Sequence, residues 1–182
     1  MHDPMMHGPF QFHGIALMFF LFGDSDYTAR LLPAVFGTVL MAIPFCFRWK
    51  LGARGAVFTS MLIMISPSLL YYSRFARNDI LMAVWALTLV VLIWRYVDTR
   101  SDRSLWAFSA VLALSFATKE TAFVHAVVLM ILLMVWKWEN IKHILQGIVA
   151  IRDAEPGVRI AFVILALMLP LGSATAGIFD PI

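Results

Sequence analysis

Two apolar stretches of this sequence are separated by the polar segment SRFARND, which carries Arg74, Arg77 and Asp79. Arginine presents a planar fork of donors that matches phosphate oxygens, and a carboxylate can act as a base or hold a divalent cation. A second polar segment, TKET, places Lys119 inside another long apolar stretch, where an ionisable residue is costly and usually functional. These residue types suit the binding of a lipid-borne phosphate beside a hydroxyl acceptor.

Each of these residues also has a purely structural interpretation. Arg74 and Arg77 can anchor a helix end among lipid headgroups and pair with Asp79. Lys119 can lie in a tight hairpin turn at the surface, with Glu120 as its ion-pair partner. The structural interpretation weakens where several such segments share one face, but the sequence alone leaves both alternatives open.

The composition places these charges in a membrane protein. Of 182 residues, 62% are hydrophobic and 14% are charged, whereas soluble domains carry about 25% charged residues. The net charge of +3 comes from basic residues scattered through short loops rather than gathered in a patch, which argues against nucleic-acid binding. Cys46 is the only cysteine, so the chain has neither a disulfide framework nor a C-x-x-C motif.

Six apolar segments approach the roughly 17–25 residues that cross a bilayer once flanking residues are counted. They are Leu31–Phe47, Gly55–Ser73, Ile80–Trp94, Ser104–Thr118, Thr121–Trp136 and Ile160–Phe179. The shorter segment Pro9–Phe22 predicts a helix along the membrane interface, with a seventh span as the alternative. The predicted fold class is all-α: a polytopic integral membrane protein of about six transmembrane helices plus an N-terminal interfacial helix.

The basic residues orient these spans. The loops Arg48–Arg54, Arg95–Arg103 and Lys137–Arg159 hold ten of the fourteen Lys and Arg residues, which predicts that they are cytoplasmic. The four remaining basic residues fall on the other side: Arg30, Arg74, Arg77 and Lys119. We therefore expect the segments HDPMMHGP, DSDYTAR, SRFARND and ATKET to converge on the non-cytoplasmic face of the cell membrane.

The N-terminal segment offers weaker chemistry. Four of its residues have spacings that could place a metal ion: His2, Asp3, His7 and His13. They match no established metal motif, so a solvated interfacial loop is the favoured interpretation. Asp24 and Asp26 are expected to cap the helix that begins near YTARLLP.

In this order along the chain, HGPF, FGDSDYTARLLPAVFG, SPSLLYYSRFARND and ATKET resemble motifs of the polytopic GT-C glycosyltransferases. The match is to their protein-O-mannosyltransferase-like branch, and within it to flippase-associated members found in N-glycosylation settings. The resemblance covers about Asp3 to Ala122. It implies a membrane hexosyltransferase that moves a sugar from a polyprenyl-phosphate donor to a protein, lipid or glycan acceptor on the non-cytoplasmic face.

The resemblance also implies roles for individual residues. By position, Arg74, Arg77, Lys119 and His7 would bind the lipid phosphate, and Asp79 would be the catalytic acid of the second outer loop. Inverting transfer needs a carboxylate to deprotonate the acceptor, and it needs cations to stabilise the charge on the departing phosphate. The metal requirement is left open, with a divalent cation as one possibility.

Two features depart from the family pattern. The family's acidic pair stands well upstream of the H-x-P motif, whereas little precedes His7 here, so Asp3 is a candidate catalytic residue by type and side only. Gly8 replaces the usual first proline, which is expected to loosen the turn. Residues 1–182 are therefore expected to form one module truncated at both ends, with an outer loop at 1–30 and a helix bundle at 31–179. A lipid-linked sugar transporter or flippase component, and a non-catalytic assembly subunit, remain the alternatives.

Overall fold

The computed structural model of the chain describes residues 8–136 and 155–176, with side chains as far as Met168. These residues form eight helices and no strand. Contacts divide the chain into two compact units. Unit 1 comprises Met1–Val91 and Leu114–Ala122, and unit 2 comprises Leu92–Ala113 and Phe123–Ile182.

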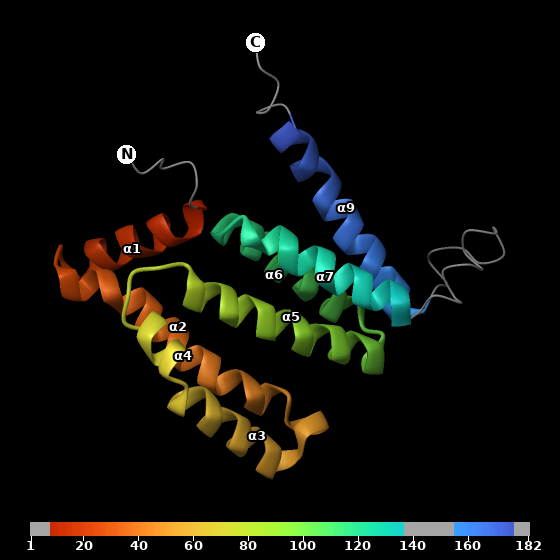
Figure 1. Cartoon of the computed structure of the whole chain (residues 1–182), viewed down its shortest axis with the longest axis horizontal. Helices are drawn as coiled ribbons and strands as arrows, with labels where there is room; N and C mark the ends of the chain where they lie inside the picture. The colour runs from red at the N-terminus through yellow and green to blue at the C-terminus, as the bar shows by residue number, and fades with distance from the viewer. Residues whose placement is uncertain (1–7, 137–154, 177–182) are drawn as a thin grey trace. The chain divides into compact units, whose positions relative to one another are not determined.

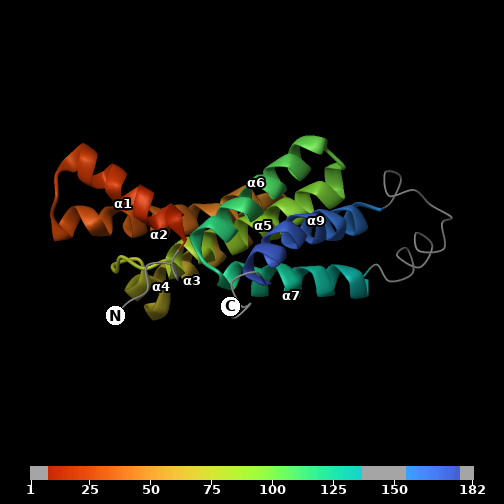
Figure 2. The same cartoon turned by 90° about the horizontal axis from the view of Figure 1, so that it is seen from above.

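Unit 1 is built around a series of antiparallel helices (Figures 1 and 2). Helix α1 (Pro9–Phe22) and helix α2 (Asp26–Cys46) lie side by side, joined by a tight turn. Helix α3 (Arg48–Ile65) runs back along α2, and the short helix α4 (Pro67–Tyr72) follows it. A loop then leads into α5 (Asp79–Thr99), whose first turns complete this unit together with the end of α6.

The α1–α2 turn is closed by reciprocal hydrogen bonds. The Ser25 hydroxyl accepts from the Thr28 backbone N–H at 3.2 Å, and the Thr28 hydroxyl accepts from the Ser25 N–H at 3.0 Å, which forms a capping box. Gly23 ends α1 with a φ of 85°, a conformation that favours glycine. The prediction that Asp24 and Asp26 cap α2 is therefore wrong. Asp26 instead lies in the first turn, where its charge complements the helix dipole.

The predicted span Gly55–Ser73 is two helices rather than one. Ser66 is extended, with φ −60° and ψ 114°, and Pro67 is the first residue of α4. A proline disfavours helical conformation in the residue before it, so α3 ends at this point. The predicted loop Arg48–Arg54 is largely helical, with a break at Gly52, whose φ is 72°.

The other helices follow the predicted segments more closely. Helix α1 and helix α7 (Thr121–Trp136) have the predicted bounds, whereas α2 and α5 are longer than predicted. Helix α6 (Asp102–Thr118) and helix α9 (Pro156–Ala176) complete the described elements. By length and composition, α2 and α5 could each cross a membrane, and α1, α7 and the first part of α9 are shorter apolar helices.

Unit 2 contains the end of α5, most of α6 and α7, and α9. Its largest fully buried side chains are Tyr96, Phe108, Leu112, Val158, Ile160 and Ile164. The guanidinium of Arg159 lies 5.7 Å from the centre of the Tyr96 ring, and its Nη2 is 3.8 Å from Asp102 Oδ1. These contacts tie the start of α9 to the end of α5 and the start of α6.

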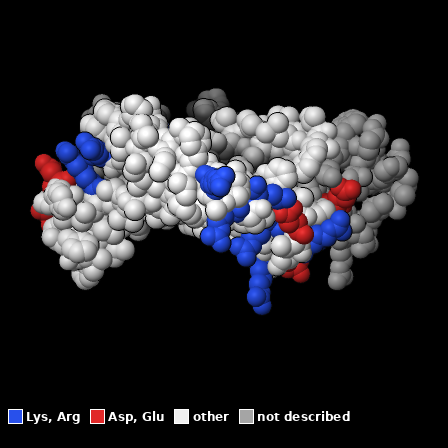
Figure 3. Space-filling model, turned by 90° about the horizontal axis from the view of Figure 1, so that it is seen from below, with Lys and Arg blue, Asp and Glu red and all other residues white. Residues whose placement is uncertain are grey.

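Many large apolar side chains point outward. Phe20 is 86% exposed and Trp106 is 77% exposed. Helix α3 alone exposes Val57, Phe58, Met61, Leu62, Met64 and Ile65. On the face drawn in Figure 3, charged side chains gather in one area at the left end and a larger one to the right of centre, and most of the visible surface carries none. Soluble proteins rarely expose so much contiguous apolar surface, which fits contact with lipid. The predicted all-α membrane protein is confirmed.

Candidate functional site

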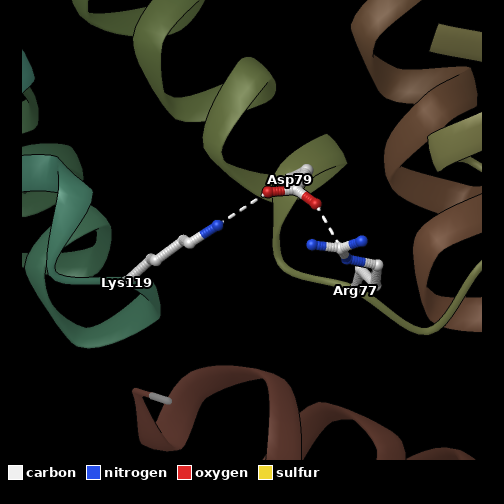
Figure 4. Close-up of polar contacts among 3 residues, drawn as sticks. All are labelled: Arg77, Asp79 and Lys119. Atoms are coloured by element: carbon white, nitrogen blue, oxygen red, sulfur yellow. Dashed lines mark hydrogen bonds and ion pairs between the residues drawn. The ribbon is translucent and has the colours of Figure 1, made fainter. Parts of the chain in front are cut away.

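Three of the residues singled out in the sequence meet in unit 1 (Figure 4). Lys119 Nζ donates to Asp79 Oδ1 at 2.7 Å, and Arg77 Nε lies 3.1 Å from Asp79 Oδ2. Asp79 begins α5, and Lys119 lies forty residues later, in the turn between α6 and α7. We call these three residues the charged triad. Lys119 is thus paired with Asp79 of a distant loop, and this long-range pair joins the segments SRFARND and TKET.

A hydrogen bond behind the charged triad holds the end of α6 against α5. The Trp85 indole Nε1 donates to Thr118 Oγ1 at 3.0 Å. The Thr118 hydroxyl in turn donates to the Leu114 carbonyl at 2.7 Å, and its side chain is fully buried. Because Thr118 immediately precedes Lys119, this bond fixes the backbone that carries the lysine.

Aromatic packing extends this support to α1 and α2. Phe10 and Phe36 each pack edge-on against Trp85, with ring centres 5.5 Å apart in both pairs. Phe10 and Phe36 also pack against each other at 6.1 Å. Edge-to-face pairs at these distances are favourable beyond the area that they bury. Trp85 is thus the residue on which α1, α2, α5 and the end of α6 meet.

Gly8, which precedes α1, lies against the backbone at the end of α6. A Cβ at this position would lie 2.2 Å from the Ala117 carbonyl oxygen and 2.7 Å from the Thr118 carbonyl carbon. Both atoms belong to the backbone, so a side chain would force a movement of the residues that lead to Lys119. Gly8 was expected to loosen the turn, but the structure shows that it permits a close approach to the end of α6.

Asn78 is a buried amide next to the charged triad. The residue is 3% exposed, and neither Nδ2 nor Oδ1 has a hydrogen-bond partner among the described residues. Its backbone carbonyl accepts from Met82 N–H at 3.0 Å, which starts α5. Buried amides are nearly always hydrogen-bonded, so an unpaired one at this position requires an explanation.

Arg74 does not join the charged triad. Its guanidinium makes no hydrogen bond or ion pair with any residue that the structure describes, and it lines a cleft of about 210 Å³. We call this the α2–α4 cleft. Its walls are largely apolar and include Leu40, Met41, Ile63, Met64, Leu69 and Leu70. Gly37 lets α4 approach α2, since a Cβ there would lie 2.8 Å from Ser73 Cβ.

Other predicted residues are not brought to the charged triad. Asp3 and His7 lie outside the described residues. The segment DSDYTAR, with Arg30, follows the far end of α1, and fourteen helical residues separate that end from Gly8 by about 20 Å. Within residues 8–136 and 155–176, no group of three His, Cys, Asp or Glu side chains could hold a metal ion.

The arrangement is suited to an amphipathic phosphate. Two cations are fixed by one carboxylate, and a third, Arg74, is left open beside an apolar cleft. Guanidinium groups bind phosphate oxygens through charge-assisted hydrogen bonds, and an apolar cleft accepts a hydrocarbon chain. Sequence reasoning identified the charged residues. It missed Trp85, Thr118 and Asn78, and the role of Gly8, because these depend on packing between distant segments.

Comparison with known proteins agrees with this chemistry. A family model described as dolichyl-phosphate-mannose-protein mannosyltransferase matches residues 6–171, a range that contains the charged triad, Arg74 and the α2–α4 cleft. No curated protein and no solved structure matches the chain. The predicted resemblance is confirmed: the chain belongs to the dolichyl-phosphate-mannose-protein mannosyltransferase family, whose members are integral membrane glycosyltransferases that use polyprenyl-phosphate sugar donors.

Proposed function

We propose that this chain is a multi-pass membrane protein that transfers a hexose from a polyprenyl-phosphate donor to a protein, lipid or glycan acceptor. The transfer would take place on the non-cytoplasmic face of the cell membrane. The observation that carries the proposal is the unpaired Arg74 at the apolar α2–α4 cleft, three residues before the first member of the charged triad. The same loop thus provides Arg74, which is free to bind a phosphate, and Arg77, which is held in place by Asp79.

The donor would bind in two parts. Arg74 would bind a phosphate oxygen, and the first part of the polyprenyl chain would lie against the apolar walls of the α2–α4 cleft. An aliphatic chain placed there leaves water for an apolar surface, which favours binding in proportion to the area covered. The cleft lacks a second charge, so the phosphate stays at the end that carries Arg74.

The reaction requires charge stabilisation at the departing phosphate. An acceptor oxygen would attack the anomeric carbon, the bond from that carbon to the phosphate oxygen would break, and the acceptor proton would pass to a carboxylate. Arg77 and Lys119 would stabilise the negative charge that develops on the leaving polyprenyl phosphate. His7 is a further predicted phosphate ligand.

Asp79 is better placed to position these cations than to take the proton. Both of its oxygens already accept contacts, one from Lys119 and the other from Arg77. A base must have an oxygen within reach of the acceptor hydroxyl. We therefore propose Asp79 as a positioning residue, and we retain Asp3 as the predicted candidate for the base.

The proposal is tested with the full-length protein in lipid nanodiscs and a radiolabelled polyprenyl-phosphate mannose. Arg74→Ala should lower sugar transfer at least tenfold. Arg30→Ala is the matched control, because Arg30 is also exposed and makes no ion pair with a described residue, and it should change transfer less than twofold. Equal activity of the two variants would contradict the assignment.

A second pair of variants tests the α2–α4 cleft. Ala34 and Ala42 are both exposed on α2, but only Ala34 lines this cleft. Ala34→Phe should fill the cleft and weaken donor binding, whereas Ala42→Phe should not. Donor binding without sugar transfer, accompanied by movement of the lipid across vesicles, would favour the flippase alternative instead.

A further inference from the structure

We propose that a second cleft, at the turn between α5 and α6 in unit 2, binds a phosphate group. The cleft has a volume of about 310 Å³ and lies between the last turns of α5 and the first turns of α6. Its polar lining consists of Arg95, Thr99, Ser101, Arg103 and Ser104. None of these residues belongs to the charged triad or to the α2–α4 cleft, so the inference stands apart from the proposed function.

The cleft carries two guanidinium groups that have no ion-pair partner among the described residues. Arg95 and Arg103 are exposed, and neither guanidinium makes a hydrogen bond or ion pair with a residue that the structure describes. The acidic residues of the turn, Asp98 and Asp102, do not line the cleft. Asp102 faces Arg159, at 3.8 Å. The two guanidinium groups are therefore available to an anion.

Hydroxyl groups add neutral donors to the same cleft. Ser104 lines the cleft, and its hydroxyl makes no hydrogen bond with a described residue. Its Oγ is not one of the fully buried unpaired atoms, so it is accessible from the cleft and can donate to a bound anion. The Ser101 hydroxyl also has no described partner. Thr99 differs, because its hydroxyl already donates to the Arg95 carbonyl at 2.7 Å.

These donors select the chemistry of the ligand. Two guanidinium forks and two open hydroxyls, with no carboxylate in the lining, match an anion that offers several acceptor oxygens. A phosphate group meets this requirement. It could come from a phospholipid headgroup or from a soluble phosphate compound. Leu92 and Ala107 also line the cleft, and an apolar wall next to cationic groups favours the headgroup.

The test measures binding of phosphatidylglycerol to the full-length protein in detergent by native mass spectrometry, with phosphatidylcholine as the uncharged comparison. The double variant Arg95→Gln/Arg103→Gln should bind phosphatidylglycerol about thirtyfold more weakly, since each of the two charges contributes about 1 kcal/mol. The matched control, Arg48→Gln/Arg54→Gln, removes two exposed charges from α3 and should lose less than threefold.

A single hydroxyl gives a second readout. Ser104→Ala should weaken binding about threefold without altering thermal stability. Its control is Ser109→Ala on the same helix, where the hydroxyl donates to the Leu105 carbonyl at 3.0 Å and does not line the cleft. This control should leave the affinity for phosphatidylglycerol unchanged.

Competition with inorganic phosphate identifies the source of the ligand. If excess inorganic phosphate does not displace phosphatidylglycerol, the ligand of the cleft is a lipid headgroup. Displacement, together with direct binding of inorganic phosphate that the Arg95→Gln/Arg103→Gln variant loses, would identify a soluble phosphate compound. Both results support a phosphate site. Wild-type affinity in this variant, or equal losses in the two double variants, would overturn it.

Discussion

The α1–α2 turn and the α4–α5 loop look alike in sequence but differ in where their polar groups find partners. Both are short, and both contain arginine and aspartate, as DSDYTAR and SRFARND. In the α1–α2 turn, Thr28 bonds to Ser25 and to the Gly23 carbonyl, all within five residues. In the α4–α5 loop, Asp79 bonds to Lys119, forty residues away.

The two segments also differ in what they leave unpaired. The α1–α2 turn satisfies its buried hydroxyl at Thr28 with local partners, so it needs no ligand to be stable. The α4–α5 loop leaves the Arg74 guanidinium and the buried Asn78 amide without described partners. Unpaired polar groups of this kind occur most often at functional sites, so they support the role that we propose for the α4–α5 loop. The local hydrogen bonds of the α1–α2 turn fit a structural role instead.

The largest expected effect concerns the long-range pair. Lys119→Ala should lower sugar transfer about a hundredfold, because removing one group that stabilises transition-state charge typically costs that much. Asp79→Ala should lower it by a similar amount, and the double variant should be no worse than either single variant. Initial rates with the radiolabelled donor measure this cycle.

The α1–α2 turn supplies the control for that cycle. Asp26→Ala and Arg30→Ala should each leave transfer near the wild-type level, and their effects should add. Additive losses for Asp79 and Lys119 would mean that the two residues act independently, and the comparison between the two segments would then fail.

Gly8→Ala should destabilise the protein by about 1–3 kcal/mol, the usual cost of overpacking. The added methyl group would meet the Ala117 carbonyl oxygen, which cannot move without shifting the turn at Lys119. Transfer should fall with stability. Gly55→Ala is the control, because its Cβ would lie 3.3 Å from Leu51 Cβ, a contact that a shift of a few tenths of an ångström relieves. A melting temperature for Gly8→Ala equal to that of Gly55→Ala would show that the close approach is unimportant.

Asp79→Asn tests positioning against proton transfer. The amide keeps the shape of the carboxylate but loses its charge, so Arg77 and Lys119 should be held less firmly. We expect kcat to fall about tenfold, since a hydrogen bond to a charged group is worth about 1.5–3 kcal/mol and Arg77 and Lys119 act on charge that develops in the transition state, while the form of the kcat–pH profile stays that of the wild type. A changed form of the kcat–pH profile would instead identify Asp79 as the base. Asp26→Asn should change neither kcat nor this profile.

Much of the architecture could be predicted from the sequence, because the lengths of apolar segments and the residues that begin and end helices are local features of the chain. The segments Pro9–Phe22 and Thr121–Trp136 have their predicted bounds. The break at Ser66 was missed because the predicted span Gly55–Ser73 runs through Pro67, whereas this proline begins a new helix. The cap at Ser25 was missed because both neighbouring aspartates are equally good capping residues by type.

The site was predictable only in its charges. Arg77, Asp79 and Lys119 stood out because ionisable groups are rare in apolar sequence. Their supports could not be found this way: the Trp85–Thr118 bond joins residues 33 apart, and tryptophan in a membrane helix is common. The same limit explains the expectation that DSDYTAR joins the site. Loop order along the chain assigns a membrane face but does not say which loops on that face touch.

The smallest expected effect returns to the α1–α2 turn. Thr28→Val keeps the shape of the side chain but removes the hydroxyl that accepts from Ser25 N–H and donates to the Gly23 carbonyl at 2.8 Å. Losing such a cap costs about 1 kcal/mol, so thermal stability should fall by a few degrees. Sugar transfer per folded molecule should stay unchanged, because every partner of Thr28 is local. A specific loss of transfer at constant stability would show that this turn also contributes to the reaction, which would remove the distinction between the two segments.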